Sequence, residues 1–377
     1  MSHQNRSTAT GTDAKRDEYF LHKLAKHRRE NQSKIKQKQQ QQQPPNVSDD
    51  AQLLRRLSFG NFRISAAVRK ELLRLDPTST GLCSVNLRER CAAHNLILEH
   101  LGLTIGTIIH GVDLANVSKS VALIIKQVLL ERKVIFFRNQ NHLTKDEHLA
   151  FGRLFGQLEI HPFSQPVKDY PEILRITNNN KKPAAINVWH SDVTWRTEPS
   201  LGSILIMREK PTFGGDTLFC DSHCQYEGLP STFKNKVQGK FAFHDFKNFR
   251  QAQRRAGVPI EMINEMVTHF PIARHPVIRT HPETGKQSVY VSENFTEHIE
   301  GLTEEESQHL LTTLYQQCRI PEYQCRFQWQ LGSVAFWDNR ACQHYASSDY
   351  FPQVRTVERV TVCGDVPFYR ESEKSKL

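Results

Sequence analysis

Beyond its first hundred residues the chain shows two hydrophobic periods, and each period predicts its own kind of element. Apolar residues recur every three or four positions over 118–133, which predicts a helix. The stretch 144–155 has the same spacing and opens with a threonine and a glutamate at capping-box distance. Strict alternation predicts a strand over 103–109, and the apolar run 134–137 predicts a short buried strand.

After residue 185 the pattern changes to short β segments separated by glycine, proline, asparagine and aspartate. Two helical inserts interrupt them, around 250–268 and 303–317. Many short strands at this spacing indicate a β-sandwich or barrel that carries helices outside it. The expected fold class is therefore mainly β with flanking helices, and the expected strands lie at 201–207, 215–219, 274–280, 287–292, 333–337 and 354–363.

The front of the chain differs in composition from the rest. Residues 1–50 are polar and contain a glutamine run, which predicts a disordered basic tail. Residues 51–95 are expected to form a helical extension, in which leucine and phenylalanine alternate with arginine up to about residue 75. We expect that segment to dock on the main domain, residues 96–371. A mitochondrial presequence has a similar composition but stands at the very N-terminus.

The net charge of +10 is concentrated in the same front region. Residues 1–100 hold 18 Lys/Arg and 10 Asp/Glu, whereas the other 277 residues hold 32 and 30. A nucleic-acid-binding role for the main domain is therefore not expected. No window approaches the roughly 18 apolar residues of a membrane span. Eight cysteines without a Cys-x-x-Cys pair fit reduced thiols in an intracellular protein. We expect a cytoplasmic location, with the mitochondrion as the alternative.

The most informative residues are two histidines and an aspartate. In a strand, His190 and Asp192 would project from the same face, because side chains alternate. An imidazole and a carboxylate on one face supply two of the three ligands of a facial Fe(II) site. His344, 154 residues later, supplies a second histidine. The three residues therefore predict a non-haem iron site.

Two arginines follow the second histidine. Arg355 and Arg359 are four residues apart, so a strand places both on one face with Val357 between them. Two guanidinium groups inside a barrel are costly unless they meet anions there. A dicarboxylate cosubstrate and an anionic substrate would satisfy that condition.

Taken together, these motifs resemble the taurine/2-oxoglutarate dioxygenase family, from about Gly102 to Arg370. The family fold is a double-stranded β-helix, or jelly roll, which agrees with the strand pattern. The resemblance is carried in order by Glu159-Ile-His161-Pro162, Trp-His190-x-Asp192-Val-Thr, Gly214-Gly-Asp-Thr217-Leu, His244-Asp-Phe246, His275-Pro-Val-Ile-Arg-Thr-His281-Pro, Trp337-Asp-Asn-Arg-x-x-x-His344-Tyr-Ala and Gly364-Asp-x-Pro-Phe-Tyr-Arg370.

The resemblance implies a role for each matching residue. Arg355 would bind the distal carboxylate of 2-oxoglutarate, and Thr217 would donate a hydroxyl to it. His161 and Arg359 would hold the substrate anion. His275 and His281 are interpreted as structural turn residues, and His244 has no assigned role. The implied iron ligands are His190, Asp192 and His344, and the implied apolar substrate contacts are Val193, Phe246 and Phe295.

The implied activity uses Fe(II), 2-oxoglutarate and O2. It hydroxylates a small sulfonate or sulfate ester at the carbon next to the heteroatom, and it releases sulfite or sulfate, an aldehyde, succinate and CO2. Ser164 and Ile186 stand at two positions that read the amine in the taurine enzyme. Ile186 has no hydrogen-bond acceptor, so we expect an acid with an apolar tail to be preferred over taurine.

Two alternatives remain open at this point. One is a dioxygenase for a quaternary-amine carboxylate, as in carnitine biosynthesis, which needs an aromatic cage to which Trp195 and Tyr345 would contribute. The other is a non-catalytic regulatory relative whose basic front binds a partner. An intact set of metal and cosubstrate residues argues against the second. Related enzymes are often dimers or tetramers, so a homo-oligomer is also left open.

Overall fold

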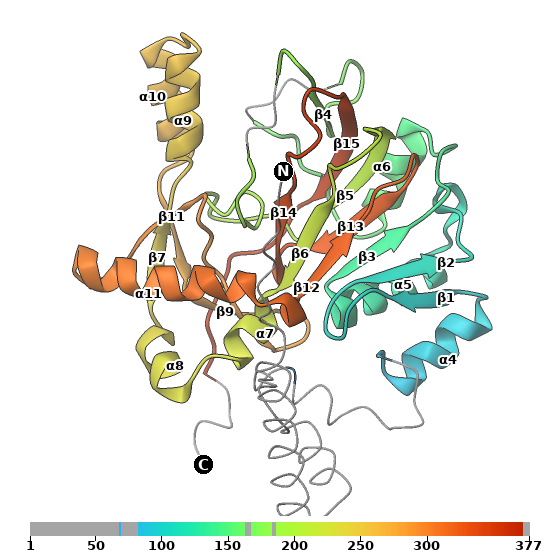
Figure 1. The fold of residues 1–377 in the computed structure, drawn as a ribbon, viewed down its shortest axis with the longest axis horizontal. Helices are drawn as coiled ribbons and strands as arrows, with labels where there is room; N and C mark the ends of the chain where they lie inside the picture. Colours follow the sequence, from blue (N-terminus) through green and yellow to red (C-terminus); the bar gives the residue numbers. More distant parts are fainter. Residues whose placement is uncertain (1–67, 69–81, 163–166, 183–185, 372–377) are drawn as a thin grey trace, which may run out of the picture. The chain divides into compact units, whose positions relative to one another are not determined.

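A seven-stranded sheet forms the largest layer of the protein (Figure 1). The structure is a computed structural model that describes residues 68, 82–162, 167–182 and 186–371. Neighbouring strands of the sheet are antiparallel, except that β2 and β3 are parallel. In spatial order the strands are β1 (Ile97–His100), β2 (Thr107–His110), β3 (Val134–Phe137), β13 (Val334–Asp338), β5 (Gly202–Glu209), β15 (Arg355–Val362) and β4 (Ile173–Asn178).

A second, three-stranded sheet faces the first. It consists of β12 (Gln324–Phe327), β6 (Thr217–Asp221) and β14 (Cys342–Ala346). Buried side chains of both sheets share one hydrophobic cluster, in which the rings of Phe136 and Phe327 stack at 3.9 Å and Phe219 lies edge-on to Phe136. Two facing sheets of this kind form the expected jelly roll, a double-stranded β-helix.

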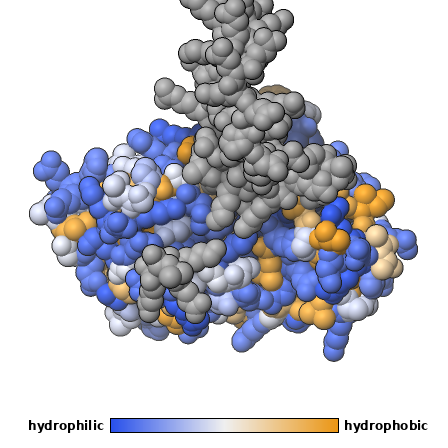
Figure 2. All heavy atoms as spheres, turned by 90° about the horizontal axis from the view of Figure 1, so that it is seen from below, coloured by the Kyte–Doolittle hydropathy of each residue, from blue (hydrophilic) through white to orange (hydrophobic). Residues whose placement is uncertain are grey.

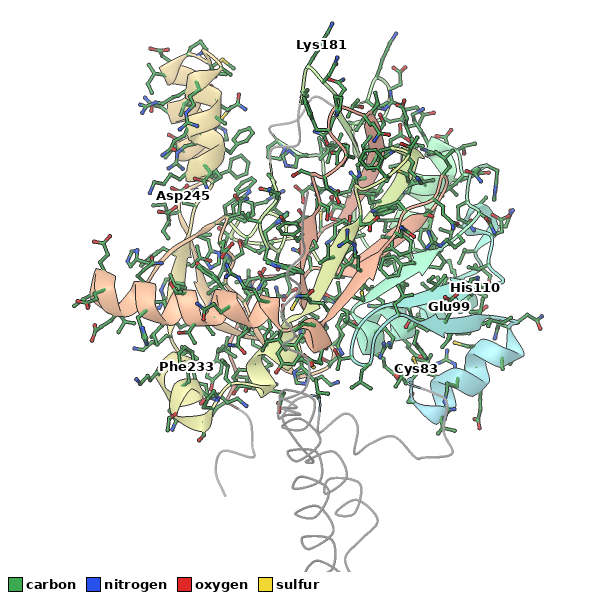
Figure 3. The ribbon with its side chains drawn as sticks, in the orientation of Figure 1. Cys83, Glu99, His110, Lys181, Phe233 and Asp245 are labelled. Carbon is green, nitrogen blue, oxygen red and sulfur yellow. The ribbon has the colours of Figure 1, made fainter. Side chains whose placement is uncertain are left out.

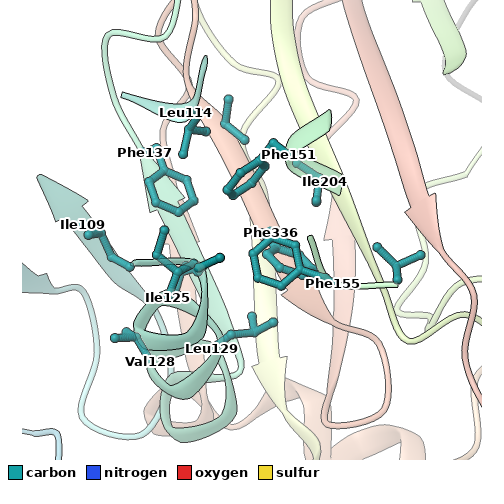
Figure 4. Packing of buried hydrophobic residues seen from close by; sticks show 14 of the residues in the cluster. Ile109, Leu114, Ile125, Val128, Leu129, Phe137, Phe151, Phe155, Ile204 and Phe336 are labelled. Carbon is teal, nitrogen blue, oxygen red and sulfur yellow. The ribbon is translucent and has the colours of Figure 1, made fainter. Parts of the chain in front are cut away.

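Helices cover the outer face of the large sheet. The α5 helix (Lys119–Arg132) and the α6 helix (Lys145–Arg153) bury their apolar faces there, against Phe336 of β13 and Val360 of β15 (Figure 4). The predicted capping box is present at the start of α6. Since alternate residues point to opposite faces, the neighbours of these outward-facing residues point into the space between the two sheets.

The remaining elements form a side group. Its sheet contains β11 (Thr296–Ile299), β7 (Phe241–His244) and β8 (Ala273–Pro276), and the hairpin of α9 (Lys247–Arg255) and α10 (Ile260–His269) joins β7 to β8. This hairpin stands out from the rest of the fold above Asp245 (Figure 3). The other elements are α4 (Val85–Ala93), α7 (Ser222–Glu227), α8 (Ser231–Val237), α11 (Glu304–Gln316), β9 (Ile278–Thr280), β10 (Gln287–Val289) and three 3-10 turns at Leu114–Asn116, Gln317–Arg319 and Pro321–Tyr323.

Several expected elements differ from those observed. The strands expected over 215–219 and 287–292, for example, occupy Thr217–Asp221 and Gln287–Val289. The strand expected over 103–109 occupies only Thr107–His110, because the carbonyl groups of Gly102, Leu103 and Gly106 accept hydrogen bonds from Arg132 instead of from a neighbouring strand. The helical insert expected around 250–268 is two helices, separated by a glycine in the left-handed region and a proline. The strand expected over 274–280 is interrupted at Val277.

The predicted tail 1–50 lies outside the described residues, and so does most of the predicted extension 51–95; its described part contains the α4 helix. None of the helices in the described part of the chain has the length and apolarity of a membrane span. On the face shown in Figure 2, hydrophobic side chains occur in small groups among hydrophilic ones.

Candidate metal centre

The two histidines and the aspartate predicted to bind iron meet at the edge of the smaller sheet. His344 belongs to β14, and His190 forms an isolated antiparallel bridge to it, with both main-chain hydrogen bonds present. The expectation that His190 and Asp192 share a strand is wrong, since residues 192–195 form a turn. The turn nevertheless directs the Asp192 carboxylate back toward the two imidazoles.

The three side chains form a group whose ligand atoms all lie within 4.8 Å of one another, the single such group among the described residues. Asp192 Oδ1 lies 4.0 Å from His190 Nε2 and 3.9 Å from His344 Nε2. His190 Nδ1 lies 2.8 Å from the carbonyl oxygen of Val188. That bond makes Nδ1 the donor and leaves Nε2 as the lone-pair nitrogen that points at the group.

The protonation states suit a cation. Burial lowers the pKa of His190, and burial together with the neighbouring His190 lowers the pKa of His344 to about 3. Burial alone would raise the pKa of Asp192, but Arg359 and the two histidines hold it below its ordinary value. Two neutral imidazoles and one carboxylate are the facial donor set of non-haem Fe(II) sites, so these residues fit that metal.

The main chain of Asp192 is fixed by Asn339, to which sequence reasoning gave no role. The Asn339 side-chain oxygen accepts from the Asp192 main-chain N–H at 2.6 Å, and its amide nitrogen donates to the Asp192 carbonyl at 2.9 Å. The Ser203 hydroxyl donates to Asp192 Oδ2 at 3.2 Å. Asn339 stands within the motif Trp337-Asp-Asn-Arg, which is the one sequence signal that pointed to it.

Arg355 lies at the start of β15, the strand that also carries Arg359, whose guanidinium contacts Asp192. The Arg355 side chain is buried, its Nε donates to the carbonyl of Gly215 at 3.2 Å, and it forms no salt bridge with any residue that the structure describes. The rings of Trp329 and Tyr350 lie 5.8 and 6.0 Å from its guanidinium carbon. A buried cation without a carboxylate partner among the described residues is costly, so the surroundings of Arg355 suit an anionic ligand.

Thr217 begins β6 and is linked to the surroundings of Arg355 by Trp329. Its hydroxyl oxygen accepts a hydrogen bond from the indole N–H of Trp329 at 3.0 Å, so its own proton is free to be donated elsewhere. Gly215, two residues earlier, has φ +70° and approaches Arg355 so closely that a Cβ there would lie 3.2 Å from the arginine side chain. The sequence did not single out Trp329 or Tyr350.

Arg359 and His161 were expected to hold a substrate anion. The structure places Arg359 next to the candidate ligands, with Nη1 3.0 Å from both carboxylate oxygens of Asp192. His161 is within electrostatic reach of Arg359, and burial first and then this arginine lower its pKa to about 4. His161 therefore lies near both Arg359 and Asp192.

The three predicted apolar substrate contacts lie close together, and one of them is near a candidate metal ligand. Val193 and Phe246 are buried in one cluster, against which the half-buried Phe295 packs, and the Phe295 ring lies 6.4 Å from that of His190. These are the three residues expected to contact the substrate through apolar surface. Ile186 is exposed, and Ser164 lies outside the described residues.

The aromatic residues considered for a quaternary-amine cage lie in separate places. Trp195 packs between Phe246 and Phe270, with ring centroids 5.1 Å from each. Tyr345 packs with Trp189 at 5.7 Å. Since Tyr345 follows His344 in β14, it points to the opposite face of that strand. These two rings therefore do not form a cage at the metal centre.

Comparison with known proteins agrees with this geometry. The chain is similar to an alkylsulfatase of Acinetobacter baylyi (35% identity over 72% of this chain and 86% of the relative) and to an alpha-ketoglutarate-dependent sulfate ester dioxygenase of Pseudomonas putida (33% over 72% and 91%). A crystal structure of a taurine dioxygenase from Burkholderia xenovorans superposes with a TM-score of 0.61 at 35% identity, covering 73% of this chain and 93% of that one. Residues 98–361 match the family model described as taurine catabolism dioxygenase TauD, TfdA family. The chain belongs to this family.

Proposed function

We propose that the protein is an Fe(II)- and 2-oxoglutarate-dependent dioxygenase that hydroxylates a small sulfonate or sulfate ester at the carbon next to the heteroatom. The products are sulfite or sulfate, an aldehyde, succinate and CO2. Relatives that are 33–35% identical carry the names alkylsulfatase and sulfate ester dioxygenase. The observation that carries the proposal is the buried guanidinium of Arg355, which has no carboxylate partner among the described residues, on the strand whose Arg359 contacts Asp192 of the His-Asp-His group.

In this proposal the residues divide into three groups. His190, Asp192 and His344 hold Fe(II), which supplies the oxygen chemistry when bound. Arg355 and the Thr217 hydroxyl bind the distal carboxylate of 2-oxoglutarate. The substrate anion is held by Arg359 and His161, while the apolar cluster of Val193, Phe246 and Phe295 contacts the rest of the substrate and excludes water.

The substrate end away from the anion is proposed to be apolar. Ile186 provides no hydrogen-bond acceptor, and Val193 and Phe246, two of the proposed substrate contacts, belong to an apolar cluster. An aminoethyl group would lose its hydrogen bonds to water without replacement, whereas an alkyl tail loses none. The amine of taurine is therefore disfavoured at this site.

The test is a substrate panel assayed with Fe(II), 2-oxoglutarate and ascorbate. Taurine, unbranched alkyl sulfonates and alkyl sulfate esters are compared by kcat/KM for the release of sulfite or sulfate. We expect an alkyl sulfonate or sulfate ester to exceed taurine. A panel in which taurine has the highest kcat/KM would overturn the proposed preference, while turnover of none of these compounds would overturn the proposed reaction.

We further propose that residues 96–371 form the catalytic domain and that the enzyme works in the cytoplasm. All eight cysteines are free thiols, which fits a reducing compartment. Cell fractionation tests the location, and recovery of the protein in mitochondria would contradict it. Activity of a chain that begins at residue 96 tests the domain boundary.

A further inference from the structure

The turn that follows Asp192 contains a residue in an unfavourable conformation. Val193 has φ +48°, which is rare for a β-branched residue because its side chain crowds the main chain there. The Arg196 N–H donates to the Val193 carbonyl at 3.0 Å and closes the turn. Such a conformation persists only when the surrounding structure fixes it. Contacts from other elements must therefore hold the main chain of Val193 in this conformation.

His275 makes the main contact from outside the turn. Its Nε2 lies 2.9 Å from the carbonyl oxygen of Thr194 and 2.8 Å from that of Arg196. Both partners are acceptors, so Nε2 carries the proton and donates to both. His275 lies in β8 and is 1% exposed, so its Nε2 has no access to water and depends on these two carbonyl groups. It is not the turn residue that the sequence suggested.

His244 supports the same turn from the neighbouring strand. Its Nδ1 lies 3.0 Å from the hydroxyl oxygen of Thr194, and its ring lies 5.1 Å from that of His275. The strands β7 and β8 that carry the two histidines are paired directly. Burial lowers the pKa of both side chains, that of His275 to about 4, so both rings are neutral and each keeps one donor nitrogen.

The two ends of the 192–196 turn are therefore held by different residues. Asn339 fixes the main chain of Asp192 at the first end, and His275 fixes the carbonyl groups of Thr194 and Arg196 at the second. We propose that His275 is a positioning residue for the metal centre, which holds the 192–196 turn so that the Asp192 carboxylate reaches the metal and the Val193 side chain faces the substrate. This inference rests on the proposed function, because it requires that Asp192 binds Fe(II).

The test is the affinity of the full-length protein for Fe(II), measured by anaerobic calorimetry without substrate. His275→Leu removes the donor, and we expect it to weaken Fe(II) binding by about 10- to 100-fold, as for other residues that orient metal ligands. The control is His148→Leu. His148 is equally buried and its Nε2 lies 3.1 Å from the Ile204 carbonyl, on the outer, helix-covered face of the large sheet. We expect that variant to lose stability and to keep its Fe(II) affinity.

Two further variants keep the test decisive if His275→Leu does not fold. A glutamine amide ends near the place of Nε2 and can donate to the same carbonyl groups, whereas an asparagine amide is one bond shorter. We expect His275→Gln to retain most of the Fe(II) affinity and His275→Asn to lose it. Equal affinity of these two, or wild-type affinity of a folded His275→Leu, would overturn the inference. Failure of the wild-type protein to bind Fe(II) would instead overturn the proposed function.

Discussion

Arg359 Nη1 lies 3.0 Å from both carboxylate oxygens of Asp192, so the residue proposed to hold the substrate anion also touches a proposed metal ligand. The two oxygens are not equivalent. Oδ1 is the oxygen that lies 3.9–4.0 Å from the two histidine Nε2 atoms, whereas Oδ2 also accepts from Ser203. Oδ1 is therefore the oxygen that faces the metal position, and Arg359 can remain paired with Oδ2 while its other N–H groups bind an anion.

Replacing Arg359 is expected to damage substrate binding far more than metal binding. Arg359→Ala removes one partner of a buried, charge-assisted contact, so KM for the anionic substrate should rise by about 30-fold or more, equivalent to ~2 kcal/mol. The Fe(II) affinity should change much less, because Ser203 still orients the carboxylate. Steady-state kinetics and anaerobic Fe(II) titration measure the two effects.

Arg175→Ala is the matched control for this experiment. Arg175 pairs with Glu358 on β15, one position from Arg359 but on the opposite face of the strand. Its loss removes an arginine–carboxylate pair of the same sheet away from the site, although Arg175 is more exposed and Glu358 keeps Arg208, so KM should stay near its wild-type value. An equal rise in KM for both variants would show that the effect is structural.

A second prediction concerns Trp329 and Thr217, at the proposed 2-oxoglutarate site. Trp329→Phe keeps an aromatic ring beside Arg355 but removes the N–H that donates to the Thr217 hydroxyl. The hydroxyl is then free to rotate, and loss of one hydrogen bond of about 1 kcal/mol predicts a roughly fivefold rise in KM for 2-oxoglutarate. KM for the sulfonate or sulfate ester should not move. A rise in KM for the sulfonate or sulfate ester alone would contradict this prediction, because it would show that Trp329 acts on the substrate and not on 2-oxoglutarate.

Buried histidines predict how stability depends on pH. Burial lowers the pKa of His148 from 6.5 to about 4. Between these values the unfolded chain binds more protons than the folded one, so the free energy of unfolding falls as the pH decreases from 6.5 to 4. His148 alone contributes about 3 kcal/mol to this fall. Urea unfolding of the metal-free protein across this window measures it.

The variant His148→Leu tests the assignment. It is less stable at neutral pH, but its free energy of unfolding should decrease less steeply between pH 6.5 and 4, because one proton fewer is taken up on unfolding. An unchanged slope would mean that His148 is protonated already in the folded state.

Local sequence patterns predicted the residue types of the site but not how they meet. His190, Asp192 and His344 stood out because these side chains are metal ligands, yet the premise of a shared strand was wrong. The bridge between His190 and His344 joins positions 154 residues apart, and such pairing leaves no local period. A β-sandwich or barrel was predictable, because alternation and turn residues mark many of the strands, whereas the jelly roll was implied by the family resemblance.

The supporting residues were missed for a different reason. Asn339 and Ser203 act through hydrogen bonds to Asp192, and Trp329 acts through one to Thr217. For Ser203 and Trp329 nothing in the sequence neighbourhood marks such a contact, since the partners come from distant strands and turns. For Asn339 the motif Trp337-Asp-Asn-Arg was the one signal. The strand expected over 103–109 starts later than predicted for a similar reason. The side chain of Arg132, at the end of α5, donates hydrogen bonds to main-chain carbonyl groups in the first part of this stretch.

The central claim is that the His-Asp-His group binds iron and couples 2-oxoglutarate oxidation to cleavage of an anionic sulfur ester or sulfonate. The most direct measurement quantifies succinate together with sulfite or sulfate from the purified protein with Fe(II), 2-oxoglutarate, O2 and a short alkyl sulfate or sulfonate. We predict equal molar amounts of succinate and released sulfur oxyanion, and neither product from Asp192→Ala. Product formation by Asp192→Ala at the wild-type rate, or no succinate from the wild-type protein with any of these acids, would contradict the claim.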